Sequence, residues 1–319
     1  MIMYMIRRII VNKNNVYLLI DYYYKEPLKI IFEKLLMTNI NCISDINDIY
    51  EETSNNIIIS YKNYDDTNKQ YHFTNNIFNN YKIVKKINNK INVIKYIRYY
   101  ILIILSTCLI NKVQKYIRSN IGFEINDGSF ERIEKSFKNN LTNKLSMFSI
   151  IKEYHYYMKR LKNLKIDKPK RCINIGILSN DYIPNKLYYD YTVEKILSNK
   201  NIYCIRIIGQ SYFSDLFVKY KLYKIRKYCK YNIGNKVINN IYFLKKLIKL
   251  QYDGIIFIKK DNIIDISTNS LIDSICSKEK IPMISIKFDN NINKINIENN
   301  INVLYDLIKL NNNNKMREN

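Results

Sequence analysis

Eight polar residues in the C-terminal half of the chain have the types and spacing of a ligand site. Asp181, Asp261 and Asp289 follow separate apolar runs, and carboxylates of this kind bind metal ions or act in acid–base chemistry. Two adjacent lysines could meet an anionic group such as a phosphate. Asp is also common in turns after strands, and solvated lysines are the plainer interpretation of the pair. The ligand-pocket candidates are Ser179, Asn180, Asp181, Tyr182, Lys259, Lys260, Asp261 and Asp289.

These candidates are expected where buried strands end. Strands joined through helices pair in parallel with right-handed crossovers, and ligands bind outside the carboxyl ends of such sheets. We therefore predict an α/β protein with a doubly wound, mostly parallel sheet of flavodoxin or Rossmann type in its C-terminal domain. The runs that predict its strands are Cys172–Leu178, Asn201–Ile208, Ile255–Ile258 and Pro282–Phe288.

The rest of the chain divides into further regions. Residues 1–80 predict a β-α-β segment, with strands at Asn15–Ile20 and Asn39–Ser44 and a further strand at Asn55–Tyr61. The segment Tyr64–Asn80 is polar and reads as a loop that contains His72. Residues 81–167 are helical in pattern and connect to the C-terminal α/β domain at 168–312, which a polar tail at 313–319 follows.

Several classes of site are disfavoured by the spacing of glycine and cysteine. Gly176 is followed by Ser179 and Asn180 rather than by more glycines, so no phosphate-binding loop of the G-x-G-x-x-G or Walker type is predicted. The six cysteines are widely spaced and form no Cys-x-x-Cys pair, so no metal ligands are predicted. The catalytic residues stay unknown.

Location and charge give two more expectations. No signal peptide is evident, and the apolar run Tyr99–Ile110 is shorter than the roughly 20 residues of a membrane span, so a cytoplasmic protein without a span is predicted. The net charge is +24, but the chain has no alanine and is rich in residues with A/T-only codons. Compositional drift explains this charge better than a functional basic surface does. Nucleic acid is then expected to bind only weakly and in a salt-sensitive way.

Three segments of the C-terminal half resemble the acyl-CoA dehydratase activase-related proteins, a family similar to the 2-hydroxyacyl-CoA dehydratase D-component. The first, Ile175–Tyr182 (IGILSNDY), parallels the family's I-G-I-L-G-R-P-Y. The second, Asp253–Ile264 (DGIIFIKKDNII), parallels D-G-I-I-Y-L-x-S-F-G-C-G-P-D. The third runs from Ile281 and Pro282 through Asp289 to Asp306. With the N-terminal strands, the resemblance covers most of residues 15–50 and 170–310.

The resemblance implies an α/β fold, and in the family it implies an iron–sulfur cluster. Ile263 stands where the family has the candidate cluster-binding Cys, and Asn300 and Asn302 replace the family's Arg and Glu. We therefore expect a diverged member with no cofactor of its own, an accessory or interaction protein for other subunits of a dehydratase or activase system. One alternative is an active component that delivers electrons to a 2-hydroxyacyl-CoA dehydratase. The second alternative is a basic nucleic-acid-binding protein, and whether the chain is an enzyme is left open.

Overall fold

The fold is taken from a computed structural model of the 319-residue chain. The structure describes residues 16–19, 25–43, 57–60, 70–72, 77–142, 144–179, 190–206, 218–229, 231, 234–259, 263–288 and 292–318. The chain forms two compact units. Unit 1 comprises Met1–Ile110 and Glu134–Tyr157, and unit 2 comprises Asn111–Ile133 and Met158–Asn319.

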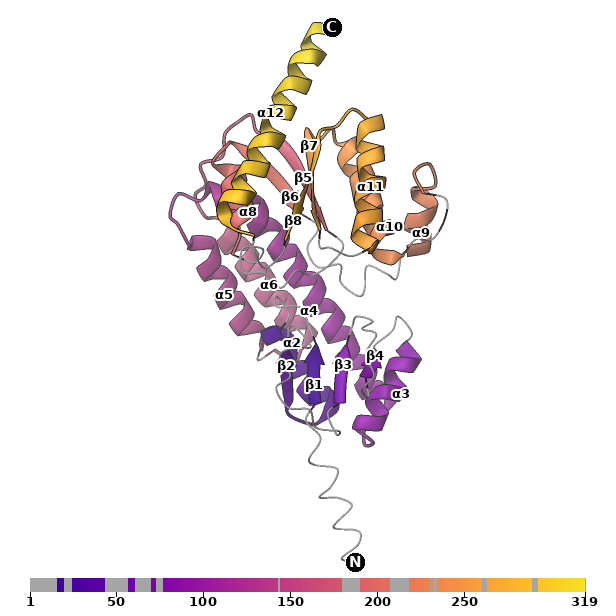
Figure 1. Ribbon diagram of the computed structural model, residues 1–319. Helices are drawn as coiled ribbons and strands as arrows, with labels where there is room; N and C mark the ends of the chain where they lie inside the picture. Colours follow the sequence, from indigo (N-terminus) through magenta and orange to yellow (C-terminus); the bar gives the residue numbers. More distant parts are fainter. Residues whose placement is uncertain are drawn as a thin grey trace, which may run out of the picture. The chain divides into compact units, whose positions relative to one another are not determined.

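Unit 1 contains a four-stranded parallel sheet (Figure 1). Its strands are β1 (Val16–Leu19), β2 (Ile40–Ile43), β3 (Ile57–Ser60) and β4 (Gln70–His72), in the order β2-β1-β3-β4. In the register, Val16 of β1 lies beside Ile40 of β2 and Ile57 of β3, and Ser60 lies beside His72. Parallel pairing requires crossovers between the strands, and the first crossover contains a helix.

That helix is α2 (Lys25–Leu36), and its apolar residues recur at helical spacing. Pro27 lies in the first turn, where its missing N–H breaks no helical hydrogen bond. The side-chain amide of Asn88 is buried and donates to the carbonyl of Leu35 at 3.0 Å, which satisfies one of the carbonyls that a helix end leaves open. The buried face consists of Leu28, Ile31, Phe32, Leu35 and Leu36.

The expected N-terminal strands are present, but the segment Tyr64–Asn80 differs from the loop expected there. It contains β4, and α3 (Ile77–Ile87) begins within it. A strand of three residues at the end of a sheet is too short to show the alternation on which a prediction depends. His72 is therefore the last residue of a strand.

Four helical segments follow α3 along the chain: α4 (Val93–Asn120), the short 3-10 helix η3 (Ile121–Phe123), α5 (Ser129–Thr142) and α6 (Met147–Lys162). Helices α4, α5 and α6 each contribute residues to both units. Among the described residues, one continuous helical stretch, Val93–Phe123, is long and apolar enough to cross a membrane. A little under half of its most apolar part is buried inside the protein.

Unit 2 contains a second parallel sheet (Figure 1). Its strands are β5 (Ile173–Ser179), β6 (Ile202–Arg206), β7 (Gly254–Lys259) and β8 (Met283–Lys287), in the order β6-β5-β7-β8. All three pairings are parallel. The helices of this unit are α8 (Thr192–Ser198), α9 (Val218–Lys224), α10 (Asn235–Lys249), α11 (Ile263–Lys278) and α12 (Lys294–Glu318).

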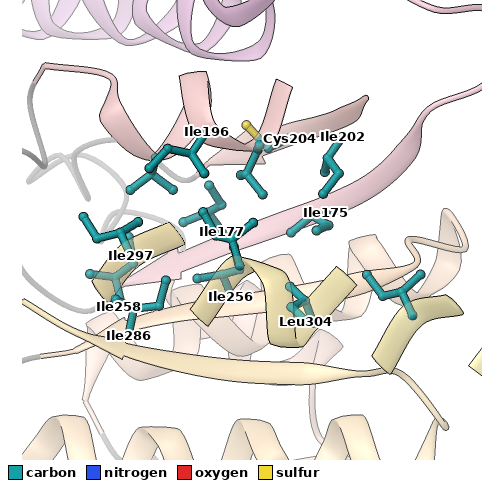
Figure 2. Packing of buried hydrophobic residues seen from close by; sticks show 14 of the residues in the cluster. Ile175, Ile177, Ile196, Ile202, Cys204, Ile256, Ile258, Ile286, Ile297 and Leu304 are labelled. Carbon is teal, nitrogen blue, oxygen red and sulfur yellow. The ribbon is translucent and has the colours of Figure 1, made fainter. Parts of the chain in front are cut away.

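Helices cover both faces of this sheet. Successive residues of each strand point to opposite faces, so each strand packs against both helical layers. Ile175 and Ile177 of β5 pack with Ile256 of β7 against α8 and α12 (Figure 2). On the other face, Leu178 of β5 and Phe257 of β7 pack against α9, α10 and α11. A sheet buried on both faces explains why its strands read as continuous apolar runs.

The protein is therefore of the α/β class, as the sequence predicted. The two sheets share one order: the second strand along the chain lies at an edge, beside the first, and the third and fourth follow. The boundaries expected at 80, 167 and 312 stay predictions.

Candidate functional site

Two of the eight predicted site residues lie within the described parts of the chain, and both end strands. Ser179 is the last residue of β5 and is buried, and Lys259 is the last residue of β7 and is half-buried. The prediction that they follow buried runs at the carboxyl edge of the sheet is therefore met for these two. The other six lie outside the described residues: Asn180, Asp181, Tyr182, Lys260, Asp261 and Asp289.

The register determines which of these strand ends are neighbours. Ser179 lies beside Ile258 of β7, so Lys259 is one residue further along and its side chain points to the opposite face. Lys259 lies beside Lys287, the exposed last residue of β8. The sheet therefore brings two lysines together on the face that α10 and α11 cover, and it separates the side chain of Ser179 from them.

A buried amide supports the end of β5. The side chain of Asn240 in α10 donates to the carbonyl of Ser179 at 3.1 Å, and Asn240 is fully buried. A carbonyl at the end of a buried strand needs such a partner where the ladder stops. This contact holds the end of β5 against α10.

The strongest electrostatic feature of unit 2 lies at the end of β6. The Glu194 carboxylate of α8 accepts hydrogen bonds at Oε1 from Arg118 at 2.6 Å and from Arg206 at 2.8 Å. All three side chains are about 1% exposed. Arg206 ends β6, while Arg118 lies in the last turns of α4. The cluster therefore ties the C-terminal part of α4 to α8 and to the edge strand.

The two guanidinium groups decide the protonation state of Glu194. Burial alone would raise its pKa, but the positive charges of Arg118 and Arg206 and the hydrogen bond from Arg118 lower the pKa below its usual value. Cys204, two residues before Arg206, has its pKa raised by burial and by the negative charge of Glu194. The carboxylate is thus ionised at neutral pH and the thiol is protonated. A protonated, buried thiol is a poor nucleophile.

An aromatic residue completes the cluster. The guanidinium carbon of Arg118 lies 4.6 Å from the ring centroid of Tyr191, and Gln114 donates to the Tyr191 hydroxyl at 3.3 Å. Tyr191 has a φ of 58°, in the left-handed region that residues with a Cβ rarely adopt. The ring contact and the buried hydrogen bond offset this backbone cost.

The cluster of Arg118, Glu194 and Arg206 was not among the predicted site residues. One signal was available, because Arg206 is a charged residue inside the apolar run Asn201–Ile208 and a buried strand excludes an unpaired charge. Arg206 binds Glu194, which lies 12 residues away, and Glu194 in turn binds Arg118, which lies 76 residues from it. Periodicity along the chain does not identify such partners.

The described residues give little evidence for a metal site or for a reactive cysteine. Within them, no group of three or more His, Cys, Asp or Glu side chains is arranged to hold a metal ion. Cys108, Cys172, Cys204, Cys229 and Cys276 are free thiols. His155 lies on α6 with its ring 5.2 Å from that of Tyr154.

The comparisons with known proteins give one distant similarity. No family model matches the chain. Protein Ycf2 of Physcomitrium patens is 28% identical to it over 255 aligned residues, which cover 67% of this chain and 11% of Ycf2. The chain thus corresponds to about a tenth of the length of that curated protein.

This finding corrects the family expectation. The assignment to the acyl-CoA dehydratase activase-related proteins was wrong, because the similarity found is to Ycf2 and nothing connects the chain to that family. The two functions inferred from it, the accessory or interaction protein and the electron-delivering component, are withdrawn. The nucleic-acid-binding alternative, which rested on the net charge, is withdrawn as well, because the similarity to Ycf2 does not support it. Ile263, read as a lost cluster ligand, begins helix α11.

Packing explains why the family motifs seemed to match. A Cβ on Gly176 would lie 2.1 Å from Leu247 Cδ1, and a Cβ on Gly254 would lie 2.7 Å from Ile308 Cδ1. A larger residue at either position would require Leu247 or Ile308 to move, so glycine favours the close approach of α10 and α12 to the sheet. The shared pattern of glycine among aliphatic residues therefore follows from a helix packed closely on a buried parallel strand.

Proposed function

We propose that unit 2 binds a small anionic molecule at the carboxyl edge of its sheet, beside Lys259 and Lys287. One observation carries the proposal: the all-parallel order β6-β5-β7-β8. The chain leaves β5 first toward β6 on one side and later toward β7 on the other. We infer from this order a doubly wound sheet of flavodoxin type, and ligands of such sheets bind at the carboxyl ends where the order reverses.

The preference for an anion rests on the two lysines. Lys259 and Lys287 are register partners on neighbouring strands, which lie about 4.8 Å apart in a sheet. Two lysines placed side by side offer two charge-assisted contacts to one anion. Helix α11 begins four residues after the last residue of β7, and its N-terminus adds a partial positive charge. Lys260, three residues before α11, is proposed to belong to the same site.

Backbone groups are proposed to do much of the binding. Ser179 is buried and its carbonyl is held by Asn240, so the segment that follows it starts from a fixed point next to β7. The candidates Asn180, Asp181, Tyr182, Asp261 and Asp289, which lie outside the described residues, are proposed to belong to the same site. Binding is the whole of this proposal, and no reaction is assigned to the site.

Titration calorimetry with inorganic pyrophosphate and with ATP tests the proposal. The variant Lys259→Gln/Lys287→Gln should weaken binding by about tenfold or more, as expected when two charge-assisted contacts are lost. Lys249→Gln/Lys278→Gln is the matched control. It removes the same charge from exposed lysines in the last turns of α10 and α11, at the opposite edge of the sheet.

Two results would overturn the proposal. The first is an absence of binding for both probes with the unmodified chain. The second is an equal loss in the two double variants, which would mean that the anion responds to the overall charge of +24 rather than to a site.

A further inference from the structure

The first half of helix α4 carries a row of exposed aliphatic side chains in unit 1. Val93, Ile94, Ile97 and Ile101 are 49%, 80%, 43% and 39% exposed. At about 100° per residue, these four positions fall within about 100° of the helix circumference. Ile104, Leu105 and Cys108 continue the row and are half-buried. We call Val93, Ile94, Ile97 and Ile101 the α4 stripe.

Single exposed aliphatic residues are ordinary, whereas a continuous exposed row signals a surface that contacts something apolar. An adjoining side of the same helix is buried: Tyr96 and Tyr100 stack with ring centroids 5.7 Å apart, and Tyr81 of α3 packs on Tyr96. The α4 stripe is thus the outer side of a helix whose inner side is already in the core of the protein.

The charged residues that the structure describes on α3 and α4 beside the stripe are all basic. On α4, Arg98 lies about 40° around the helix from Ile94, and Lys95 lies about 100° from it. Lys90 lies three residues before the helix, and all three side chains are exposed. On α3, Lys82, Lys85 and Lys86 are exposed as well. From Thr67 to Phe123, a segment of 57 residues, the sequence has ten lysines and arginines and no Asp or Glu. Any partner of this surface must therefore offer apolar contact and negative charge together.

We propose that unit 1 binds peripherally to an anionic lipid surface through the α4 stripe. A bilayer of this kind presents acyl chains directly beneath negatively charged head groups. An in-plane helix with an aliphatic side and basic flanks matches that profile. A second copy of the chain fits less well, because a symmetric contact through the stripe would bring Arg98 of each copy close to the basic residues of the other.

The same helix argues for surface binding rather than a span. Its C-terminal part belongs to unit 2, where Arg118 is buried and bonded to Glu194. The part in unit 1 runs from Val93 to Ile110, 18 residues, or about 27 Å of helix, and a bilayer core is about 30 Å thick. The same segment contains Lys95 and Arg98, which a span would carry into the bilayer core at a high cost in free energy.

The chain contains no Trp, so a single introduced Trp reports on one position. Ile94→Trp should shift its fluorescence to the blue on addition of phosphatidylcholine vesicles that contain about 30% phosphatidylglycerol, and it should respond little to pure phosphatidylcholine. Leu310→Trp is the matched reporter, because Leu310 is 61% exposed on α12 and its emission should stay unchanged.

Vesicle flotation at about 0.15 M salt supplies the second measurement. Ile94→Ser/Ile97→Ser/Ile101→Ser should reduce the floated fraction by about tenfold or more, since it removes the apolar contact. Ile295→Ser/Val303→Ser/Leu310→Ser on α12 removes three equally exposed aliphatic residues and should float like the unmodified chain. Urea unfolding followed by Tyr fluorescence checks that both triple variants fold.

Four outcomes would overturn the proposal. They are a failure of the unmodified chain to float with anionic vesicles, flotation of the α4 variant equal to that of the control, retention of the chain in the membrane after alkaline carbonate extraction, and a change of oligomeric mass in the α4 variant without loss of flotation. The third would indicate a span and the fourth a second copy of the chain.

Discussion

Arg118 and Glu194 are 76 residues apart in the sequence and bonded at 2.6 Å inside the protein. The contact joins the C-terminal part of α4 to α8 within unit 2, and Arg206 of β6 binds the same carboxylate oxygen at 2.8 Å. Two guanidinium groups share one carboxylate, so the cluster depends on Glu194 more than on either arginine. This unequal dependence leads to the first prediction.

Glu194→Gln should destabilise unit 2 by about 3–5 kcal/mol, because it leaves two guanidinium groups buried without the charge that holds them. Arg118→Met/Glu194→Leu/Arg206→Met should cost far less, since it removes the buried charges together with their desolvation penalty. Urea unfolding monitored by Tyr fluorescence measures both free energies of unfolding.

Lys195→Gln is the control for these variants. Lys195 lies next to Glu194 in α8 and pairs with Glu131 at 3.0 Å, but this ion pair is partly exposed to solvent. Its loss should cost less than about 1 kcal/mol. Equal costs for Lys195→Gln and Glu194→Gln would contradict the assignment of a buried, interdependent cluster.

The pH dependence of stability should also change at Glu194. Its pKa is lowered in the folded protein, so the unfolded chain binds more protons at this residue in acid. The stabilisation is fully present above the unfolded pKa of about 4.3 and is lost as the pH falls below that value. The unmodified chain should therefore lose more stability than Glu194→Gln between about pH 5 and pH 3.

Free energies of unfolding measured across this pH range for both proteins test the prediction. All other carboxylates titrate equally in the two chains, so the difference between the curves isolates Glu194. Parallel curves would mean that the arginines do not lower its pKa.

A third prediction concerns the approach of α10 to the centre of the sheet. Gly176→Ala would place a Cβ 2.1 Å from Leu247 Cδ1 and should cost about 1–3 kcal/mol through overpacking. Leu247→Ala should cost about 2–5 kcal/mol alone, because it leaves a cavity. The double variant should cost less than the sum of the two, since the smaller side chain removes the clash.

A double-mutant cycle of unfolding free energies measures this coupling. Gly128→Ala is an informative control, because a Cβ there meets nothing within 4 Å and only the φ of 74° is strained. If the changes in free energy of unfolding caused by the two substitutions were strictly additive, the small size of Gly176 would not be needed for the packing of Leu247.

Much of the fold could be read from local pattern. The runs around Ile175, Ile202 and Ile255 are apolar because both faces of their sheet are covered, and that pattern identifies buried strands without any partner. The edge strand β4 was missed, since three residues at a sheet edge leave no period to detect. The carboxyl-edge position of Ser179 and Lys259 followed from strand ends alone.

The pairing of Lys259 with Lys287 and the separation of Ser179 from them could not be predicted. Both depend on the order and register of strands that are far apart in the chain, and a shift of one residue would reverse the faces. The mistaken family assignment has the same origin, because the positions of Gly176 and Gly254 reflect close packing against Leu247 and Ile308.

The amino-acid sequence by itself determined where the buried strands of unit 2 lie, and it determined that one long segment around α4 carries positive charge without any acid. The spacing of hydrophobic residues and the local charge depend on residues that are close in the sequence, so both can be identified from the sequence alone. Only the tertiary structure decided that Glu194 lies between Arg118 and Arg206 and that the side of α4 at Ile94 and Ile97 is exposed. Burial and ion pairing depend on distances between residues far apart in sequence, which exist only once the chain has folded.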